Sequence, residues 1–154
     1  PGAKTLFVEK QLRKDYGHFA LMGRLDRVDE YEDGTLEVVD YKSGRSEVTP
    51  EQVANDIAMS CYQLLLRHRF PGRPVRARIV AIRSGVSEVA SLDDEQVAEF
   101  EELLLEIARG IFAKEMFYDE IPVIKSLCGK CDFLPLCRKH DEFEVTFSEA
   151  AALD

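Results

Sequence analysis

Hydrophobic and polar residues alternate along two stretches of the chain that flank an Asp-Gly pair. Residues 19–31 and residues 35–42 carry apolar side chains at every second position over part of their length, which is typical of half-buried β-strands. The Asp33-Gly34 pair between them is a strong signal for a tight turn. The pattern therefore predicts an antiparallel hairpin.

The length of the loop decides the register of this hairpin. A three-residue loop at residues 32–34, with its glycine in the left-handed conformation, would place Val28 opposite Val38. The same register places Asp26 opposite Asp40. A two-residue loop would shift the pairing by one residue and separate the two acids.

Helical spacing of apolar residues appears in two later stretches. The segment "TPEQ" carries a capping signal and opens a helix that is expected to run to about Phe70. The apolar stripe of this helix is expected to comprise Val53, Ile57, Cys61, Leu64 and Leu65. A second long helix is expected to begin at Asp93 or Asp94 and to end near Phe117.

The order of the remaining elements predicts the fold class. Residues 75–83 and residues 86–91 are expected to form strands around a Ser-Gly turn, and residues 5–16 are expected to form a short helix. A strand, a helix and a second strand in succession predict a right-handed parallel crossover. The chain is therefore expected to be an α/β protein with a mixed central β-sheet and flanking helices.

Composition limits the alternatives. The chain has 154 residues, of which 45% are hydrophobic and 32% charged, as expected for one globular domain. No apolar run approaches the roughly 18 residues of a membrane span, and no signal peptide is visible, so we expect a cytoplasmic protein. We also expect a fragment of a longer chain, with one domain at 1–140 and an acidic tail at 141–154.

The net charge of −9 argues against a nucleic-acid partner when it is taken alone. The acids, however, are clumped, and bases gather in "RHRFPGRPVRAR". The arginines of that segment that could contact phosphates are Arg67, Arg69, Arg73, Arg76 and Arg78. Exposed charges without a binding role explain the same segment equally well.

The hairpin places two carboxylates and a lysine at one end. Directly opposed like charges destabilise a sheet, but Asp26 and Asp40 are tolerated together if a divalent cation lies between them. Oxygen ligands suit Mg²⁺ or Mn²⁺, and the backbone carbonyl of Tyr41 could complete the shell. Lys42, on the same face as Asp40, could polarise a water molecule. Surface ion pairs of Asp26 with Arg24 or Arg27, and of Asp40 with Lys42, are the alternative.

At this point the residues resemble a known family. The segments "GRLDRVD" and "LEVVDYKSG" are similar to the RecB-type branch of the PD-(D/E)XK nuclease superfamily. The resemblance implies a restriction-endonuclease-like core that hydrolyses DNA phosphodiesters with Mg²⁺ or Mn²⁺. It implies metal ligation by Asp26 and Asp40 and catalysis by Lys42. Glu9 is a weaker match to the glutamate that such nucleases often carry upstream.

The helix after Lys42 departs from the family pattern. RecB-like members usually carry a Gln-x-x-x-Tyr motif, and aligning Tyr62 with its tyrosine puts Ala58 where the glutamine belongs. Either Gln63 substitutes for that glutamine or the motif is degenerate. We expect Tyr62, Gln63 and Arg67 to contact the substrate.

Three cysteines crowd into one short segment. Cys128, Cys131 and Cys137 form a C-x₂-C-x₅-C pattern, whose thiolates can converge on one metal or cluster. Three unrelated core cysteines are the alternative. The position resembles that in RecB-like nucleases whose cysteines hold a [4Fe–4S] cluster as a structural staple. The fourth ligand would then be Cys61 or a residue outside this chain, and Zn²⁺ is a second candidate for the site.

These features predict a metal-dependent DNA nuclease. The resemblance implies an exonuclease acting on single-stranded DNA ends, in DNA repair and recombination or in CRISPR-type processing. No Gly-rich phosphate loop is present, so a helicase partner or a fused helicase domain would have to supply NTP hydrolysis. The alternatives are a catalytically inactive nucleic-acid-binding module and a zinc- or cluster-stapled interaction module.

Overall fold

The computed structural model describes residues 2–44, 47–113 and 131–139. Contacts divide the chain into two compact units, Pro1–Ala108 and Arg109–Asp154. The five strands of the described residues lie in the first unit. The predicted acidic tail and Cys128 lie outside the described residues.

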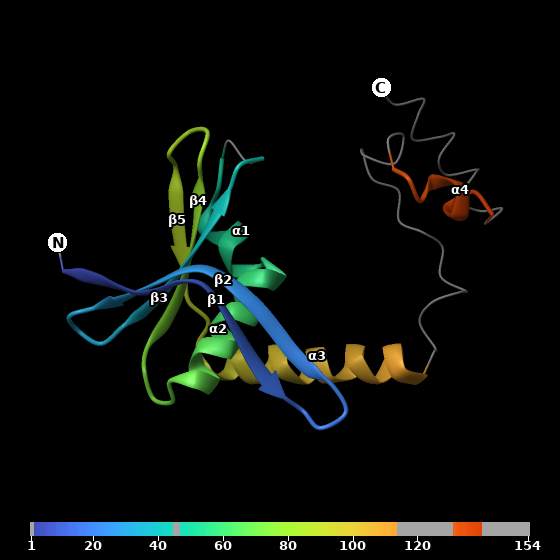
Figure 1. Cartoon of the computed structure of the whole chain (residues 1–154), viewed down its shortest axis with the longest axis horizontal. Helices are drawn as coiled ribbons and strands as arrows, with labels where there is room; N and C mark the ends of the chain where they lie inside the picture. Colours follow the sequence, from blue (N-terminus) through green and yellow to red (C-terminus); the bar gives the residue numbers. More distant parts are fainter. Residues whose placement is uncertain (1, 45–46, 114–130, 140–154) are drawn as a thin grey trace. The chain divides into compact units, whose positions relative to one another are not determined.

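The first unit contains a mixed five-stranded sheet (Figure 1). Its strands follow the chain order: β1 (Ala3–Asp15), β2 (Ala20–Tyr31), β3 (Leu36–Lys42), β4 (Val75–Ala81) and β5 (Ser87–Ala90). Strands β3 and β4 pair in parallel, and the other neighbours pair antiparallel. The predicted α/β class with a mixed sheet and a parallel crossover pair is confirmed.

The predicted hairpin between β2 and β3 is also confirmed in its register. Gly34 has a φ of 85°, and the Tyr31 N–H donates to the Thr35 carbonyl at 2.9 Å, which closes a three-residue loop. Val28 pairs with Val38. Turn chemistry and alternation agree here, so local sequence was sufficient to predict this element.

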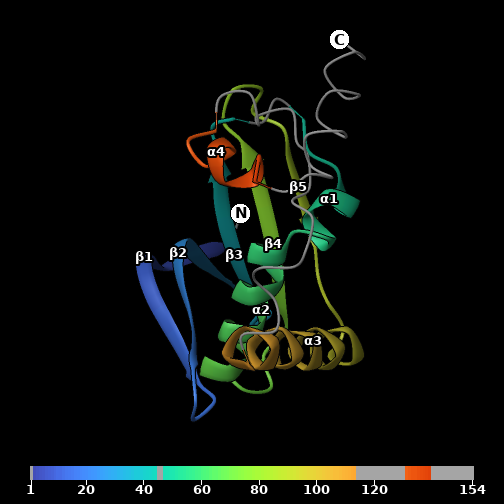
Figure 2. The same ribbon diagram turned by 90° about the vertical axis from the view of Figure 1, so that its right-hand side faces the viewer.

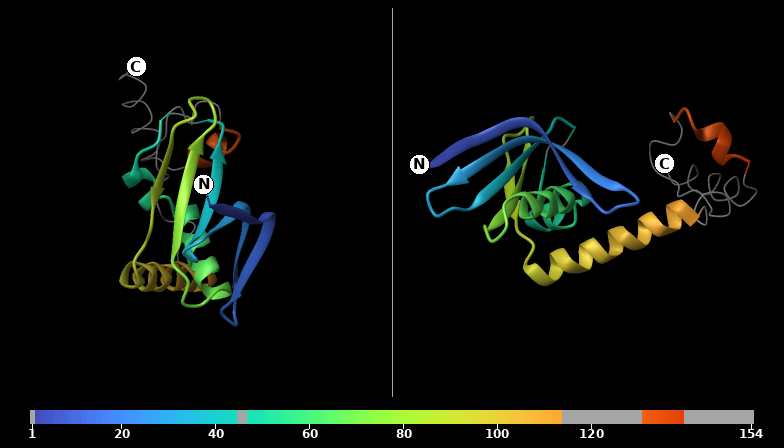
Figure 3. Two further views of the ribbon diagram at one scale, coloured as in Figure 1. Left: turned by 90° about the vertical axis from the view of Figure 1, so that its left-hand side faces the viewer. Right: turned by 60° about the horizontal axis from the view of Figure 1, so that its bottom comes forward.

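The prediction of a helix at residues 5–16 is wrong. All but the last of these residues lie in β1, which pairs with β2 along nearly its whole length and forms a long ribbon with it (Figure 3). Leu12 is buried on this ribbon, while Leu6 and Phe7 pack against the core from partly buried positions. Pairing with β2 supplies a partner that outweighs the weak helical spacing of these three residues.

The prediction of a single helix up to Phe70 is also wrong, because the segment forms two helices. Helix α1 (Pro50–Ala54) has the predicted capping box at Thr49, and α2 (Ile57–Arg69) starts afresh after Asp56. The Asp56 carboxylate accepts hydrogen bonds from the first amides of α2, which makes it the cap of a new helix.

The break changes which residues of α2 face the core. Ile57 is 72% exposed, so it does not belong to the predicted apolar stripe. Leu64 and Leu65 of that stripe are buried, and so are Met59 and Leu66, which were not predicted. Helix α2 contacts strands β1 to β4 and lies on one face of the sheet (Figure 2).

The next helix is α3 (Asp94–Ala113), and it begins where the sequence predicts. The Asp93 side chain accepts the Gln96 N–H, and the Gln96 side chain accepts the Asp93 N–H, which forms a reciprocal cap. A short helix, α4 (Leu134–Cys137), lies in the second unit. Among the described residues, no helix is both long and apolar enough to cross a membrane.

Candidate functional site

The two predicted acids lie at the end of the β2–β3 ladder. The last backbone pair toward this end is Arg27 with Val39, so the next position brings Asp26 opposite Asp40. The Asp26 Oδ2 atom accepts a hydrogen bond from the Tyr41 N–H at 3.1 Å. Asp26 is thus tied to the residue that lies between Asp40 and Lys42.

Asp40 is buried beside a single ammonium group. Its residue is 6% exposed, and its Oδ2 atom lies 2.7 Å from Lys42 Nζ. Among the described residues, the Lys42 ammonium is the one polar partner of this oxygen. A carboxylate oxygen can accept two contacts, so Oδ2 is available to one further ligand.

The alternative of ion pairs describes Asp40 but not Asp26. Arg24 pairs with Glu9, and Arg27 pairs with Asp29, so neither arginine of the "GRLDR" segment is paired with Asp26. Asp40 does pair with Lys42, but at a buried position.

Tyr62 on α2 lies beside the same site. Burial raises the pKa of its hydroxyl, the negative charges of Asp40 and Asp26 raise it further, and Lys42 opposes them. The Tyr62 ring also lies directly against Gly23 of β2, so the helix and the hairpin meet at this place. Three charged residues and one tyrosine from β2, β3 and α2 therefore form one cluster.

Glu9 lies opposite Asp26 in the β1–β2 ladder. The recorded pairs on either side are Val8 with Arg27 and Lys10 with Leu25, and Glu9 itself has a φ of 48°. Its carboxylate lies 2.7 Å from the Arg24 guanidinium, with both side chains largely exposed. The structure therefore places the backbone of Glu9 beside the site and its carboxylate on Arg24.

Comparison with known proteins identifies the family. A family model described as the PD-(D/E)XK nuclease superfamily matches residues 2–138. The chain belongs to the PD-(D/E)XK nuclease superfamily. The mixed sheet with flanking helices agrees with the restriction-endonuclease-like core of these nucleases.

One curated relative and one solved structure are similar to this nuclease domain. The CRISPR-associated exonuclease Cas4/endonuclease Cas1 fusion of Myxococcus xanthus (strain DK1622) is 30% identical over 139 residues. The match covers 86% of this chain but only 24% of that protein, so the chain spans about a quarter of the relative. The crystal structure of SSO0001 matches with a TM-score of 0.44 and 11% identity, over 88% of this chain and 59% of that one.

Gly23 is required for the close approach of the hairpin to α2. A Cβ atom at this position would lie 2.8 Å from Leu65 Cδ1 and 2.9 Å from the Tyr62 ring. Both distances are shorter than real Cβ contacts, and Leu65 is fully buried, so the ring of Tyr62 would have to move.

We therefore expect Gly23→Ala to displace Tyr62 from the acids of this nuclease. Overpacking should lower the free energy of unfolding by about 1–2 kcal/mol, as measured by urea denaturation. Gly44→Ala is the matched control, because a Cβ there meets nothing within 4 Å. Equal stability of the two variants would contradict this account of Gly23.

The other two residues predicted to contact the substrate do not reach the cluster. Gln63 is fully buried, and its Oε1 atom accepts the Leu92 N–H at 3.0 Å. Arg67 forms an ion pair with Asp94 and donates to the Leu92 carbonyl. Gln63 therefore has no surface to offer a substrate, and the guanidinium of Arg67 is engaged within the protein.

Arginines of the basic segment also have partners inside the chain. Arg73 contacts the Gly34 carbonyl and Glu30, while Arg76 and Arg78 both contact Glu37. These contacts hold the arginines on the sheet and reduce the charge that they offer to phosphates.

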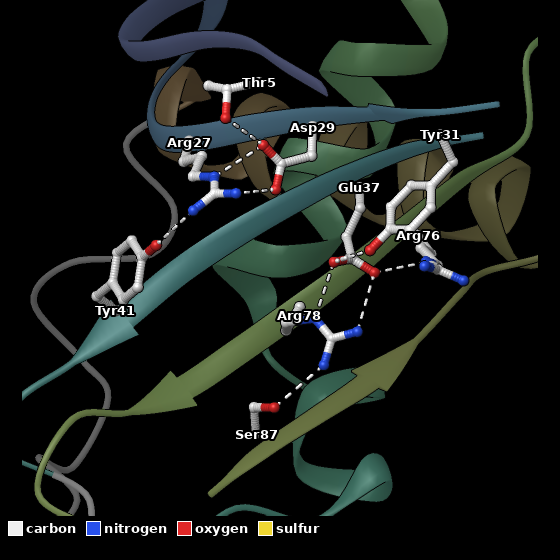
Figure 4. A network of polar contacts seen from close by, with 9 residues as sticks. All are labelled: Thr5, Arg27, Asp29, Tyr31, Glu37, Tyr41, Arg76, Arg78 and Ser87. Atoms are coloured by element: carbon white, nitrogen blue, oxygen red, sulfur yellow. Dashed lines mark hydrogen bonds and ion pairs between the residues drawn. The ribbon is translucent and has the colours of Figure 1, made fainter. Parts of the chain in front are cut away.

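Sequence reasoning missed the carboxylates on the other face of the sheet. Asp29 and Glu37 are buried, and arginines hold both of them (Figure 4). Glu37 could have been found, because an acid among the apolar residues of "LEVVD" requires a cation and "VRARIV" presents arginines at strand spacing. Asp29 gives a weaker signal, because charged residues surround it in the sequence.

Histidine, cysteine and acidic residues do not form a larger metal cluster in this part of the chain. Among the described residues, no group of three or more such side chains is placed to hold a metal ion. Cys131 is exposed and Cys137 is partly exposed. Cys61 lies on α2, where burial and the charge of Asp56 raise the pKa of its thiol and disfavour the thiolate.

Proposed function

We propose that this domain is a RecB-like, metal-dependent deoxyribonuclease that hydrolyses phosphodiester bonds at single-stranded DNA ends. The observation that carries the proposal is the opposed pair of Asp26 and Asp40 with Lys42 beside it. The superfamily supports nuclease chemistry, and the Cas4 exonuclease part of the relative's name supports an action on ends.

The residues present fit a divalent cation. Two carboxylates that lie opposite each other repel, and the buried Oδ2 of Asp40 has a free lone pair. We propose that Asp26, Asp40 and the carbonyl of Tyr41 hold Mg²⁺ or Mn²⁺, with water completing the shell. The bound cation supplies Lewis acidity toward a phosphoryl oxygen and toward water.

Lys42 contributes a fixed positive charge. Burial lowers the pKa of its ammonium, but Asp40 and the charges beyond it raise the pKa by more, so the net shift is upward. The group is therefore protonated at neutral pH and acts as a hydrogen-bond donor. We propose that it orients the attacking water and stabilises the charge that develops on the phosphate. Glu9 remains a proposed helper at the edge of the site.

The cysteine segment is proposed as a structural element. We propose that Cys128, Cys131 and Cys137 hold an iron–sulfur cluster or Zn²⁺ that stabilises the region after the nuclease core. The printed name of the relative joins Cas4 to Cas1, which favours CRISPR-type DNA processing with a fused partner domain over a helicase-linked repair role.

We expect Lys42→Met to separate catalysis from metal binding. Loss of a donor aimed at developing charge should slow cleavage of end-labelled single-stranded DNA by about 10²–10³-fold. Mn²⁺ binding should persist, because both acids remain. Lys4→Met is the control, since Lys4 is an exposed lysine on β1.

The same assay tests the proposed function. Wild-type cleavage should stop in EDTA and return when Mg²⁺ or Mn²⁺ is added in excess. Cleavage that continues in EDTA would contradict the proposal. DNA binding without any cleavage would favour the inactive binding module.

A further inference from the structure

The backbone of Tyr41 determines how the two acids face each other. Its N–H holds the Asp26 carboxylate, and its carbonyl is a proposed metal ligand. The backbone ladder of β2 and β3 ends one pair earlier, at Arg27 and Val39. The acids therefore lie beyond the last backbone pair of the ladder, where the bond from the Tyr41 N–H to Asp26 joins β3 to β2. A second interaction of Tyr41 joins the two strands at the same place.

That interaction lies on the opposite face of the sheet. Arg27 donates through Nε to Asp29 Oδ1 at 2.7 Å, and its Nη2 lies 2.6 Å from Asp29 Oδ2. The third nitrogen, Nη1, donates to the Tyr41 hydroxyl at 3.4 Å. One guanidinium thus binds a carboxylate on its own strand and a side chain of the next strand (Figure 4).

Asp29 anchors this guanidinium. The residue is 4% exposed, and its Oδ1 atom also accepts the Thr5 hydroxyl at 2.9 Å from β1. A bidentate contact fixes the plane and the direction of Arg27, which a single point charge would not do. The chain of contacts therefore runs from β1 through β2 to β3.

We propose that Arg27, anchored by Asp29, is a positioning residue that holds Tyr41 and thereby sets the separation of Asp26 and Asp40. The inference rests on the proposed metal site, because its effect is exerted on metal ligands. It assigns a role to two charged residues that touch neither metal nor substrate. Residues that contact the metal ligands, but not the metal itself, typically change metal affinity by tenfold or more when they are removed.

The test is a calorimetric titration with Mn²⁺ in the absence of DNA. Arg27→Lys keeps the charge but cannot bind Asp29 with two nitrogens and reach Tyr41 with a third, so Mn²⁺ affinity should fall about tenfold. Tyr41→Phe removes only the hydroxyl and should weaken binding roughly threefold. The two substitutions act on one link, so the double variant should be no weaker than Arg27→Lys alone.

Arg78→Lys is the matched control. Arg78 also donates to a buried carboxylate on this face of the sheet, but its hydrogen-bond partners are Glu37 and Ser87 and not Tyr41. A purely structural role for Arg27 predicts that both lysine variants lose thermal stability and bind Mn²⁺ alike. The positioning role predicts weaker Mn²⁺ binding for Arg27→Lys only.

The outcomes separate the inference from the proposed function. A wild-type protein that binds Mn²⁺ no better than Asp40→Asn overturns the metal site and the positioning role together. A wild-type protein that binds Mn²⁺ and cleaves DNA, with equal affinity in Arg27→Lys and Arg78→Lys, overturns the positioning role alone. Weaker binding in Arg27→Lys, at unchanged affinity in Arg78→Lys, supports it.

Discussion

Asp40→Asn is expected to reduce cleavage of end-labelled single-stranded DNA by about 10³-fold, equivalent to about 4 kcal/mol of transition-state stabilisation. The substitution keeps the shape of the side chain but removes the charge of the buried carboxylate that lies opposite Asp26 and 2.7 Å from Lys42. Excess Mn²⁺ should not restore the rate, because the lost group is a ligand.

The same variant should remain folded. Two opposed carboxylates repel in the metal-free state, and an asparagine in place of Asp40 would remove that repulsion at the cost of the ion pair with Lys42. We therefore expect the two effects to offset each other in part, with a free energy of unfolding in EDTA within about 2 kcal/mol of wild type. Asp33→Asn, in the turn of the same hairpin, is the charge-matched control and should cleave at the wild-type rate. Full activity of Asp40→Asn would refute the assignment of this ligand.

Glu37→Gln is expected to have the largest effect on stability. The carboxylate is 2% exposed and binds Arg76 at 2.5 Å, Arg78 at 2.8 Å and the Tyr31 hydroxyl at 3.0 Å. Removing its charge leaves two guanidinium groups without their counter-ion. We expect a loss of about 3 kcal/mol in the free energy of unfolding, because both arginines are partly exposed and water compensates part of the cost.

The stability that Glu37 provides should depend on pH. Burial raises the pKa of its carboxyl, but the hydrogen bond and charge of Arg78 and the charge of Arg76 outweigh burial. The net effect is that the pKa of Glu37 is lowered from its usual 4.5. A depressed folded-state pKa gives stability that is complete above the unfolded-state pKa and is lost as the pH falls through the folded-state pKa. The difference between wild type and Glu37→Gln should therefore be full at pH 7 and shrink below about pH 4.5.

Urea denaturation at several pH values measures this difference directly. Glu32→Gln is the control, because Glu32 is exposed in the adjacent turn and should change stability by less than about 0.5 kcal/mol. A constant difference between wild type and Glu37→Gln from about pH 7 to about pH 3 would contradict the role of the ionised carboxylate.

The hairpin and the opposed acids could be predicted from the sequence because their signals are local. Asp33-Gly34 specifies the turn, the turn specifies the register, and the register places Asp26 opposite Asp40. Residues 5–16 could not be predicted in this way. Their strand conformation depends on pairing with β2, and no residue within the segment specifies that partner.

Other features depended on tertiary contacts in the same way. The apolar spacing through Ile57 predicted one helix, but the Asp56 side chain caps a new one and turns Ile57 outward. The contact between Arg27 and Tyr41 was not predicted either, because the strand register alone does not show which neighbour a long arginine side chain will bind. Gln63 was expected at the substrate, and its position on α2 buries it instead.

The most direct test of the central claim is the position of the metal. In crystals grown with Mn²⁺, an anomalous difference map should show a peak between Asp26 and Asp40, at about 2.0–2.3 Å from a carboxylate oxygen of each. Such a peak would show that the opposed acids are the metal ligands. An active, Mn²⁺-dependent protein whose crystals show Mn²⁺ elsewhere, with none between these acids, would contradict the account.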